Sequence, residues 1–348
     1  MKLKAGLVGL HFGAQIIDSI FRSGEGGEIL DLVSVCDLQR ERCDEIAKKH
    51  SVRAVYDLDT LLADESLQVI LLFTGPVGRA ELIRKCIRAG KHVMTTKPFE
   101  QNSEAAASVL AEARRLNRVV YLNSPGPRPS EDLRIIRGWE NTYDLGRLVG
   151  AHHECWYKSV EEADGSWYDD PERCPAPPIL RLGIYGINDL VQFFSDPEEI
   201  QVQQSRIFTG RPTSDFARLS IKFRDGSLVD SLTGWVCQPG RAAQSLTLYY
   251  ENGTVFRNPV LHPEIMHGGG AGTYLCVVTK DSPDSMPEEQ FRLRADQLGS
   301  RYDFRAFHHA ITTGKRPEDE TADEIIVSAV KILEGVKAAV KQGGVVQL

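Results

Sequence analysis

Cysteine pairs, long apolar runs and blocks of basic residues are missing from this chain, and each absence argues against a class of protein. The seven cysteines are scattered, odd in number and form no C-x-x-C motif, which argues against a disulfide framework and a zinc site. No apolar run approaches the ~18 residues that a membrane span needs, and the first residues show no signal-peptide pattern. The net charge is −7 without a dense Lys/Arg block, which argues against nucleic acid as a partner. We therefore expect a cytoplasmic protein, not bound to membranes, with buried and inert thiols.

The overall composition is that of an ordinary globular protein. The chain has 348 residues, of which 42% are hydrophobic and 26% are charged. At ~100–200 residues per domain, this length predicts two domains, each large enough to bury its own core.

The first third of the chain alternates short apolar runs with helical patterns. Strands are predicted at 3–10, 30–36, 53–56, 68–73, 91–95 and 119–122, and helices at 14–22, 40–50, 79–89 and 103–116. Gly90 is expected to end the third of these helices and Ser103 to cap the fourth. Such alternation predicts an α/β fold, in which a doubly wound parallel sheet carries helices on both faces.

After residue 124 the pattern changes to one that strands dominate. A helix is predicted at 131–139, and the pairs Asp225-Gly226 and Asn252-Gly253, each between apolar runs, are strong hairpin signals. A closing helix at 322–341 has apolar residues at helical spacing and is expected to pack as core. We therefore predict a Rossmann domain at 1–124, followed at 125–348 by an α+β domain with a large, mostly antiparallel sheet.

The turn after the first predicted strand reads Gly9-Leu10-His11-Phe12-Gly13-Ala14. It matches the dinucleotide motif G-x-G-x-x-G/A at Gly9 and Ala14, but His11 stands where the second glycine belongs. Two interpretations stay open. The turn could bind a pyrophosphate with helix N-terminal amides near His11, Phe12 and Gly13, or it could be a tight connection from strand to helix.

The second predicted strand is followed directly by Asp37, where a dinucleotide fold places an acidic residue on the ribose hydroxyls. The carboxylate of Asp37 would repel a 2′-phosphate, so NAD is favoured over NADP. Arg40 could pair with that phosphate, which leaves NADP open. The alternative role for Asp37 is a cap for the helix that begins at Arg40.

Residues 89–98, Ala-Gly-Lys-His-Val-Met-Thr-Thr-Lys-Pro, resemble the A-G-K-H-V-x-x-E-K-P stretch of the Gfo/Idh/MocA oxidoreductases. Thr74-Gly75-Pro76 resembles the T-x-P loop that borders the cofactor in that family, and 304–317 resemble its closing helix and turn. The resemblance implies an NAD(P)-dependent oxidoreductase acting on a sugar, cyclitol or polyol, with Thr74, Gly75 and Lys97 beside the cofactor. It also implies a homo-oligomer that associates through the second sheet. The chain departs from the pattern at Thr96, a glutamate in the family, and at Arg79, commonly a histidine.

Lys97 has a chemical interpretation of its own. It follows a predicted parallel strand at the sheet edge where ligands bind in open α/β folds. A lysine there can hydrogen-bond a substrate hydroxyl and take part in proton transfer, provided that burial lowers its pKa. The alternative is an exposed lysine at the end of a strand.

Residues 179–190 resemble the D-x-G-x-H-x-x-x-D helix of the same family, in the variant with Tyr185 in place of histidine. Helical spacing puts Arg181, Tyr185 and either Asn188 or Asp189 on one face. Tyr185 and Lys97 would handle the proton of a hydride transfer, unless Tyr185 is a buried tyrosine with a hydrogen-bonded tip. Arg181, an aspartate in the family, predicts a clamp for a carboxylate or phosphate of the substrate, or else a surface ion pair.

Further candidates rest on weaker grounds. The family pattern implies substrate contacts for three residues that could equally be ordinary strand or loop residues: Arg128, Trp156 and Lys158. Asp189, the last position of the helix motif, is a further substrate candidate. The pairs His152-His153 and His308-His309 point their rings apart, so no metal site is predicted. The departures at His11, Thr96 and Arg181 support a competing function, a non-catalytic dinucleotide- or metabolite-binding protein of the same fold.

Overall fold

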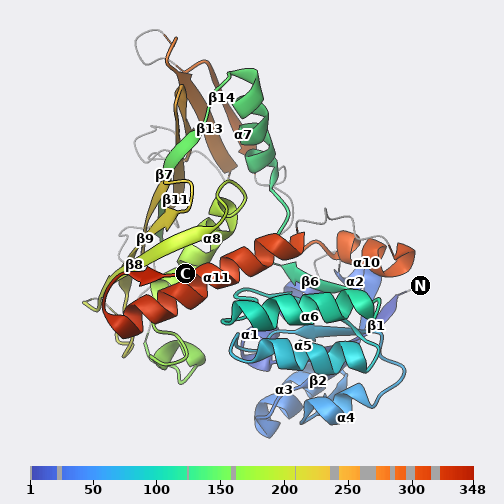
Figure 1. Cartoon of the computed structure of the whole chain (residues 1–348). Helices are drawn as coiled ribbons and strands as arrows, with labels where there is room; N and C mark the ends of the chain where they lie inside the picture. The colour runs from blue at the N-terminus through green and yellow to red at the C-terminus, as the bar shows by residue number, and fades with distance from the viewer. Residues whose placement is uncertain are drawn as a thin grey trace. The chain divides into compact units, whose positions relative to one another are not determined.

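A computed structural model of the chain describes residues 2–21, 26–123, 125–157, 162–207, 209–235, 243–258, 272–282, 287–294, 302–314 and 322–348. The chain forms two compact units (Figure 1). The first comprises Met1–Pro127 and Arg301–Val330, and the second comprises Arg128–Ser300 and Lys331–Leu348. The predicted boundary at 124/125 assigns Arg301–Val330 to the second domain, whereas in the structure this segment belongs to the first unit.

A parallel sheet forms the centre of the first unit. Its strands are β1 (Leu3–Val8), β2 (Leu30–Cys36), β3 (Arg53–Val55), β4 (Val69–Leu72), β5 (His92–Thr96) and β6 (Val120–Asn123). They lie in the order β3-β2-β1-β4-β5-β6, and all neighbours run parallel. The order reverses between β1 and β4, which confirms the doubly wound sheet and places its ligand edge at the carboxyl ends of the strands.

Helices cover both faces of this sheet. On one face, α4 (Leu58–Leu62), α5 (Arg79–Arg88) and α6 (Ser103–Arg115) share a core that includes Ile70 and Ile83. Figure 1 shows α5 and α6 side by side on that face. On the other face, α1 (Leu10–Phe21), α3 (Arg40–His50) and α10 (Phe304–Thr313) pack around residues such as Leu7 and Phe307. The buried ring of Phe307 explains why residues after 301 belong to the first unit. The short helix α2 (Gly26–Ile29) precedes β2.

One predicted helix start and one predicted helix cap need correction. Helix α1 begins at Leu10 rather than at residue 14, because the side chain of Asp37 accepts a hydrogen bond from its first amide. Helix α6 begins at Ser103 as predicted, but Asn102 is its cap, since Asn102 Oδ1 accepts from the Ala105 N–H at 2.7 Å. Gly90 follows α5 with a φ of +79°, as its predicted role requires.

The second unit contains a mixed, mostly antiparallel nine-stranded sheet in the order β14-β13-β12-β11-β7-β10-β9-β8-β15. The strands are β7 (Leu148–Trp156), β8 (Pro197–Ser205), β9 (Phe216–Phe223), β10 (Leu228–Gly234), β11 (Ala243–Tyr250), β12 (Gly253–Arg257), β13 (Gly272–Thr279), β14 (Glu289–Arg294) and β15 (Val346–Gln347). Strands β7 and β10 run parallel, and the other described neighbours run antiparallel. Both predicted hairpins, β9–β10 and β11–β12, are confirmed.

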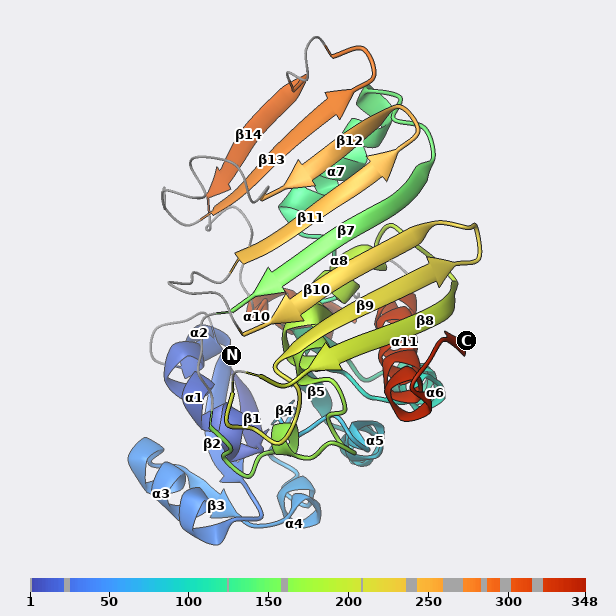
Figure 2. The same cartoon turned by 90° about the vertical axis from the view of Figure 1, so that its left-hand side faces the viewer.

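One face of this sheet carries helices, and none of the described helices covers the other, which we call the open face (Figure 2). Helices α7 (Glu131–Thr142) and α8 (Ile184–Leu190) lie behind the strands in that view, and α11 (Ala322–Gln342) packs by Gly335 against Ile200 of β8. The exposed side chains of the open face include Leu228 and Tyr249, which alternate along β10 and β11 with the buried Val229 and Leu248. None of the described helices is long and apolar enough to cross a membrane.

The described cysteines carry no disulfide. Five of them are buried, and Cys276 is half-buried. Burial raises the pKa of Cys36 and of Cys86 to about 12, so these thiols stay protonated and unreactive at neutral pH. Cys237 lies outside the described residues.

Candidate functional site

The turn between β1 and α1 accepts only glycine at its first position. Gly9 has a φ of +90°, and a Cβ there would lie 2.8 Å from the carbonyl oxygen of Phe73. The Gly9 N–H donates to the Cys36 carbonyl at 3.0 Å. Gly9 therefore lets the backbone pass close to the end of β4, as the first glycine of a dinucleotide turn does.

The other residues of the predicted turn belong to the first turn of α1. His11 is exposed, and the Phe12 ring makes an edge contact with Phe73 at 6.0 Å between centroids. Gly13 is buried, its N–H donates to the Gly9 carbonyl, and a Cβ there would lie 2.6 Å from Cδ2 of Leu7. Gly13 thus serves the close packing of helix on strand. Cofactor contacts by His11, Phe12 and Gly13 stay predictions.

Asp37 connects the end of β2 to the start of α1. Its carboxylate accepts from the Leu10 N–H at 2.7 Å and from the Gln39 N–H at 2.9 Å. The alternative role as cap of α3 is wrong, because Gln39 is the cap residue of that helix and makes no side-chain cap bond. An ionised carboxylate can accept about four hydrogen bonds. The two that remain suffice for the hydroxyls of a ribose.

Arg40 lies close by on an aromatic support. Its guanidinium carbon is 4.3 Å from the centre of the Tyr56 ring. The Tyr56 hydroxyl donates to Asp44 at 2.7 Å, and this hydrogen bond raises the pKa of Tyr56. The stacking holds the cation of Arg40 near the ends of β2 and β3, where it could meet a 2′-phosphate.

The loop after β4 contains a buried hydroxyl that indicates a ligand. Thr74 Oγ1 is buried and has no hydrogen-bond partner among the described residues. Leaving such a group unpaired costs about 1–3 kcal/mol, which a bound hydroxyl or amide would recover. Gly75, next to it, is half-buried. The close approach at Gly9, the acceptor capacity of Asp37 and the unpaired Thr74 hydroxyl together fit a dinucleotide.

Lys97 emerges at the same edge of the sheet. It directly follows β5, is half-buried, and precedes Pro98 through a cis peptide bond. The carboxyl ends of β1, β2, β4 and β5 thus bring together Gly9, Asp37, Thr74 and Lys97, all within the first unit. Thr96, where the resembled family has glutamate, is buried.

Tyr185 lies in the second unit, where two glycines bring its helix close to the sheet. It is half-buried in α8, which continues from a π-helical segment at Pro178–Gly183. A Cβ on Gly183 would lie 3.1 Å from Cγ2 of Thr233, and one on Gly186 would lie 2.2 Å from the His153 ring. Glycine at 186 is therefore necessary for the close contact that sets the place of Tyr185, and Gly183 keeps a tight approach to β10. Short π-helical segments occur frequently at functional sites.

The two adjacent histidines of β7 face opposite sides, as predicted. His153 is buried, and its Nδ1 lies 2.8 Å from Oγ of Ser231. Burial lowers the pKa of His153 to about 3, so its ring is neutral. His152 lies on the open face, with Nε2 3.1 Å from Oε1 of Glu154.

Asp189 and Asn188 are turned toward the interior of the second unit. Asn188 is buried, and Asp189 accepts from Nη2 of Arg257 at 2.6 Å. The same guanidinium donates to Asp132 of α7 at 3.2 Å, which makes a buried ion-pair cluster joining α7, α8 and β12. Asp189 therefore anchors α8 in the structure. Its contact with substrate stays a prediction.

Arg181 lies among aromatic side chains that the sequence did not single out. Its guanidinium carbon is 4.0 Å from the centre of the Tyr168 ring and 5.0 Å from that of Trp235. The indole N–H of Trp235 is buried and has no hydrogen-bond partner among the described residues. Arg211 lies 6.0 Å from the same Tyr168 ring and pairs with Asp169 at 2.6 Å. No local motif indicates these residues, because three separate loops and strands supply them.

The remaining substrate candidates are scattered. Trp156 stacks on Phe216 at 5.4 Å between centroids. Arg128 is half-buried at the start of the second unit. Lys158 lies outside the described residues, as do Lys315–Pro317 of the predicted closing turn. Their roles stay predictions.

Comparison with known proteins gives two family models and several relatives. Residues 3–124 match the oxidoreductase family model with an NAD-binding Rossmann fold, and 137–256 match the Gfo/Idh/MocA C-terminal domain. An uncharacterized oxidoreductase of Schizosaccharomyces pombe, C115.03, is 26% identical over 171 residues, which are 48% of this chain and 45% of that protein. The scyllo-inositol 2-dehydrogenase (NADP(+)) IolU of Bacillus subtilis is 22% identical over 339 residues, which are 95% of each chain.

The extent of these matches differs from one relative to another. The chain spans about half the length of the first curated relatives it matches, between 40% and 60% of three of them. Among solved structures, the WlbA dehydrogenase from Bordetella pertussis in complex with NADH and UDP-GlcNAcA has a TM-score of 0.72 at 15% identity. That alignment covers 100% of this chain and 99% of the other. The two family models together cover more than half of the chain, which belongs to the Gfo/Idh/MocA oxidoreductases and has their NAD-binding Rossmann domain.

Proposed function

We propose that this protein is an NAD(P)-dependent oxidoreductase that interconverts a secondary alcohol and a ketone on a sugar, cyclitol or related polyol. The observation that carries the proposal is the position of Lys97, which shares the carboxyl edge of the Rossmann sheet with Gly9, Asp37 and Thr74. The relative named scyllo-inositol 2-dehydrogenase supports the polyol class. Asp37 favours NAD, and Arg40 leaves NADP possible.

The nicotinamide would supply or accept the hydride, and the protein would handle the proton. The Lys97 amine would hydrogen-bond the reacting hydroxyl and orient it. The Tyr185 phenol, which can donate or accept a proton, would relay the hydroxyl proton. A positioned acid or base typically contributes about 10²–10⁴-fold to the rate.

Arg181 supports an acidic substituent on the substrate. Its guanidinium is held over the Tyr168 ring and beside Trp235, whose buried indole N–H has no hydrogen-bond partner among the described residues. The guanidinium and the neighbouring indole N–H are both hydrogen-bond donors. They fit a carboxylate or phosphate, which accepts several hydrogen bonds at once. Within the proposed function we therefore expect acidic polyols to be turned over faster than their neutral counterparts.

The test is a panel of neutral and acidic sugars and cyclitols, each with NAD⁺ and NADP⁺, followed by the absorbance of the reduced nicotinamide. Lys97→Ala and Tyr185→Phe should each lower turnover, and NADH affinity should change little in Tyr185→Phe. If the two residues serve one step, the double variant should lose much less than the product of the single losses. Matched controls are Lys85→Ala and Tyr249→Phe, which change exposed side chains elsewhere.

The competing function is a non-catalytic binding protein of the same fold, which the departures at His11, Thr96 and Arg181 favour. It predicts tight NADH binding, no turnover on any substrate of the panel, and no effect of Tyr185→Phe. Turnover that is fully retained in either single variant, or losses that multiply, would refute the paired roles of Lys97 and Tyr185.

A further inference from the structure

A guanidinium is buried directly beneath the segment that carries Lys97. Arg79 is the first residue of α5 and is only 1% exposed. Burying a cation costs several kcal/mol after relaxation, so a buried arginine is kept only where it has strong partners. Arg79 is also one of the positions at which the sequence departs from the resembled family.

The hydrogen-bond partners of this guanidinium include three backbone carbonyls at the ligand edge of the sheet. Nη1 donates to the carbonyls of Thr96 and Pro98, and Nη2 donates to the carbonyl of Thr74. The first two carbonyls stand immediately before and after Lys97 in the chain. The third belongs to the residue whose buried hydroxyl has no partner among the described residues. A single planar group therefore joins the Lys97 segment to the loop after β4.

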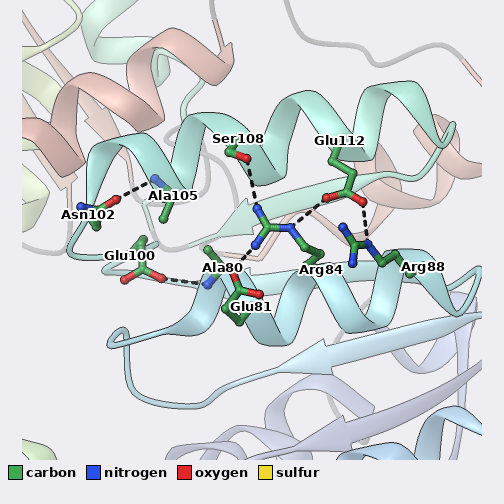
Figure 3. Close-up of polar contacts among 9 residues, drawn as sticks. All are labelled: Ala80, Glu81, Arg84, Arg88, Glu100, Asn102, Ala105, Ser108 and Glu112. Atoms are coloured by element: carbon green, nitrogen blue, oxygen red, sulfur yellow. Dashed lines mark hydrogen bonds and ion pairs between the residues drawn. The ribbon is translucent and has the colours of Figure 1, made fainter.

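A side chain that follows Lys97 in the chain also binds the backbone at the start of α5. Glu100 is 3% exposed, and its Oε2 accepts from the Ala80 N–H at 2.8 Å (Figure 3). Its Oε1 accepts from the Gln101 N–H at 2.7 Å. Thus the side chain at the start of α5 holds the backbone around Lys97, and a side chain just after Lys97 holds the backbone at the start of α5.

Helices α5 and α6, which flank the Lys97 segment in the chain, are joined by side-chain contacts. Arg84 Nε of α5 lies 2.8 Å from Oε2 of Glu112 in α6, and Arg88 Nε lies 2.7 Å from the other oxygen (Figure 3). Arg84 also donates to Ser108 at 3.1 Å. These contacts fix α5 to α6, but none of them involves the three carbonyls that Arg79 binds.

Two departures from the family pattern meet at this point, since Arg79 binds the carbonyl of Thr96. A histidine offers at most two donors, on opposite sides of its ring, whereas a guanidinium offers five in one plane. Only the latter can serve three carbonyls from adjacent nitrogens.

We propose that Arg79 is a positioning residue for Lys97. It fixes the carbonyls on both sides of Lys97 relative to the carbonyl of Thr74. It thereby fixes the direction in which the Lys97 side chain extends from the backbone. The catalytic consequence rests on the proposed function, because it requires Lys97 to orient the substrate hydroxyl. A misplacement of about 1 Å at a reacting group can cost about 10²-fold in rate.

The experiment compares three substitutions of Arg79 in the full chain. Arg79→Met keeps much of the length and removes every donor. Arg79→Lys keeps the charge but has one nitrogen, and Arg79→His restores the residue common in the family. Arg84→Met is the matched control, because it removes an arginine from the next turn of the same helix and leaves the three carbonyls untouched.

Four quantities are measured for each variant. They are the melting temperature, the Kd for NADH, the rate at which an acylating reagent modifies Lys97 relative to Lys85 by mass spectrometry, and kcat and KM on the substrate from the panel. In Arg79→Met we expect kcat to fall by about 10–10²-fold, with a smaller change in KM, and the reactivity of Lys97 to change several-fold. Arg79→Lys should recover part of both effects. Arg84→Met should lower the melting temperature without either effect.

The modification rate separates this proposal from the proposed function, since it needs no substrate. If no substrate is found but Lys97 reactivity changes in Arg79→Met and not in Arg84→Met, the positioning role stands while the proposed function fails. If the melting temperature falls in Arg79→Met while Lys97 reactivity and kcat match the control, Arg79 is structural only and the proposal is overturned. Should Arg79→Met not fold, Arg79→Lys decides by the same comparison.

Discussion

Acid should destabilise the second unit through His153, whose ring is neutral in a fully buried position. Burial lowers the pKa of His153 to about 3, and nearby Arg257 adds to the effect. In the unfolded chain a histidine has a pKa of about 6.5. Between these values the unfolded chain binds a proton that the folded chain does not. The free energy of unfolding is therefore fully retained above about pH 6.5 and falls as the pH drops toward about 3.

The expected loss is large relative to the stability of an ordinary domain. Within this window one histidine costs about 1.4 kcal/mol of unfolding free energy for each pH unit. Between about pH 7.5 and about pH 4.5 the loss is therefore about 2.7 kcal/mol, against a typical total of about 5–15 kcal/mol. His92 in β5, whose pKa burial lowers to about 4, should act in the same direction on the first unit.

Tryptophan fluorescence isolates the second unit in a urea titration. All four tryptophans lie in that unit, at Trp139, Trp156, Trp167 and Trp235. His153→Leu removes the titrating ring and its hydrogen bond to Ser231. Loss of that bond should lower the free energy of unfolding by about 1 kcal/mol at neutral pH. The variant should then lose about 2.7 kcal/mol less than the native protein between the two pH values.

The control for this experiment is His152→Gln, on the same strand but facing the other side of the sheet. It should keep the native dependence of stability on pH. If His153→Leu also keeps that dependence, the buried ring is not the source of the acid sensitivity and the reasoning is refuted.

Two substitutions test the cofactor residues, and one scattering measurement tests the open face of the nine-stranded sheet. Gly9→Ala should abolish measurable NADH binding in calorimetry, since its Cβ would lie 2.8 Å from the Phe73 carbonyl at a φ of +90°; near-native affinity would contradict the close approach. Asp37→Ala should narrow a preference for NADH over NADPH in fluorescence titrations, because it removes the repulsion of a 2′-phosphate, whereas a native preference for NADPH would show that Arg40 dominates. Solution scattering should find more than one chain per particle, associated through the open face of the nine-stranded sheet, and a monomer at micromolar concentration would contradict that interface.

The sequence predicts the elements of the first unit well, because each parallel strand and amphipathic helix there has its own apolar pattern. Strand β2 and helix α3 have the predicted bounds at 30–36 and 40–50. The start of α1 could not be found in this way, since its first amide is bonded by Asp37, 27 residues further along the chain. A cap that comes from another element leaves no local signal.

The candidate site divides along the same line. Asp37, Thr74 and Lys97 follow predicted strands, and strand order alone brings them to one edge. The surroundings of Arg181 were not predictable, because Tyr168 and Trp235 come from segments without any shared pattern. The carbonyl partners of Arg79 could not be predicted either. Every residue has a backbone carbonyl, and only the tertiary fold determines which three of them lie beside Arg79.

The residues proposed to handle the proton are positioned through contacts with their backbone, whereas Arg181, proposed to recognise the substrate, is held through its side chain. Tyr185 takes its place from a helix that glycines bring against β7 and β10, and the Lys97 segment is held through its own carbonyls. Arg181 depends instead on a stack of aromatic rings, which can change without moving the helix backbone. Substitutions around Arg181 should therefore alter which substrate is accepted while the chemistry at Lys97 and Tyr185 persists, because the two functions rest on different parts of the packing.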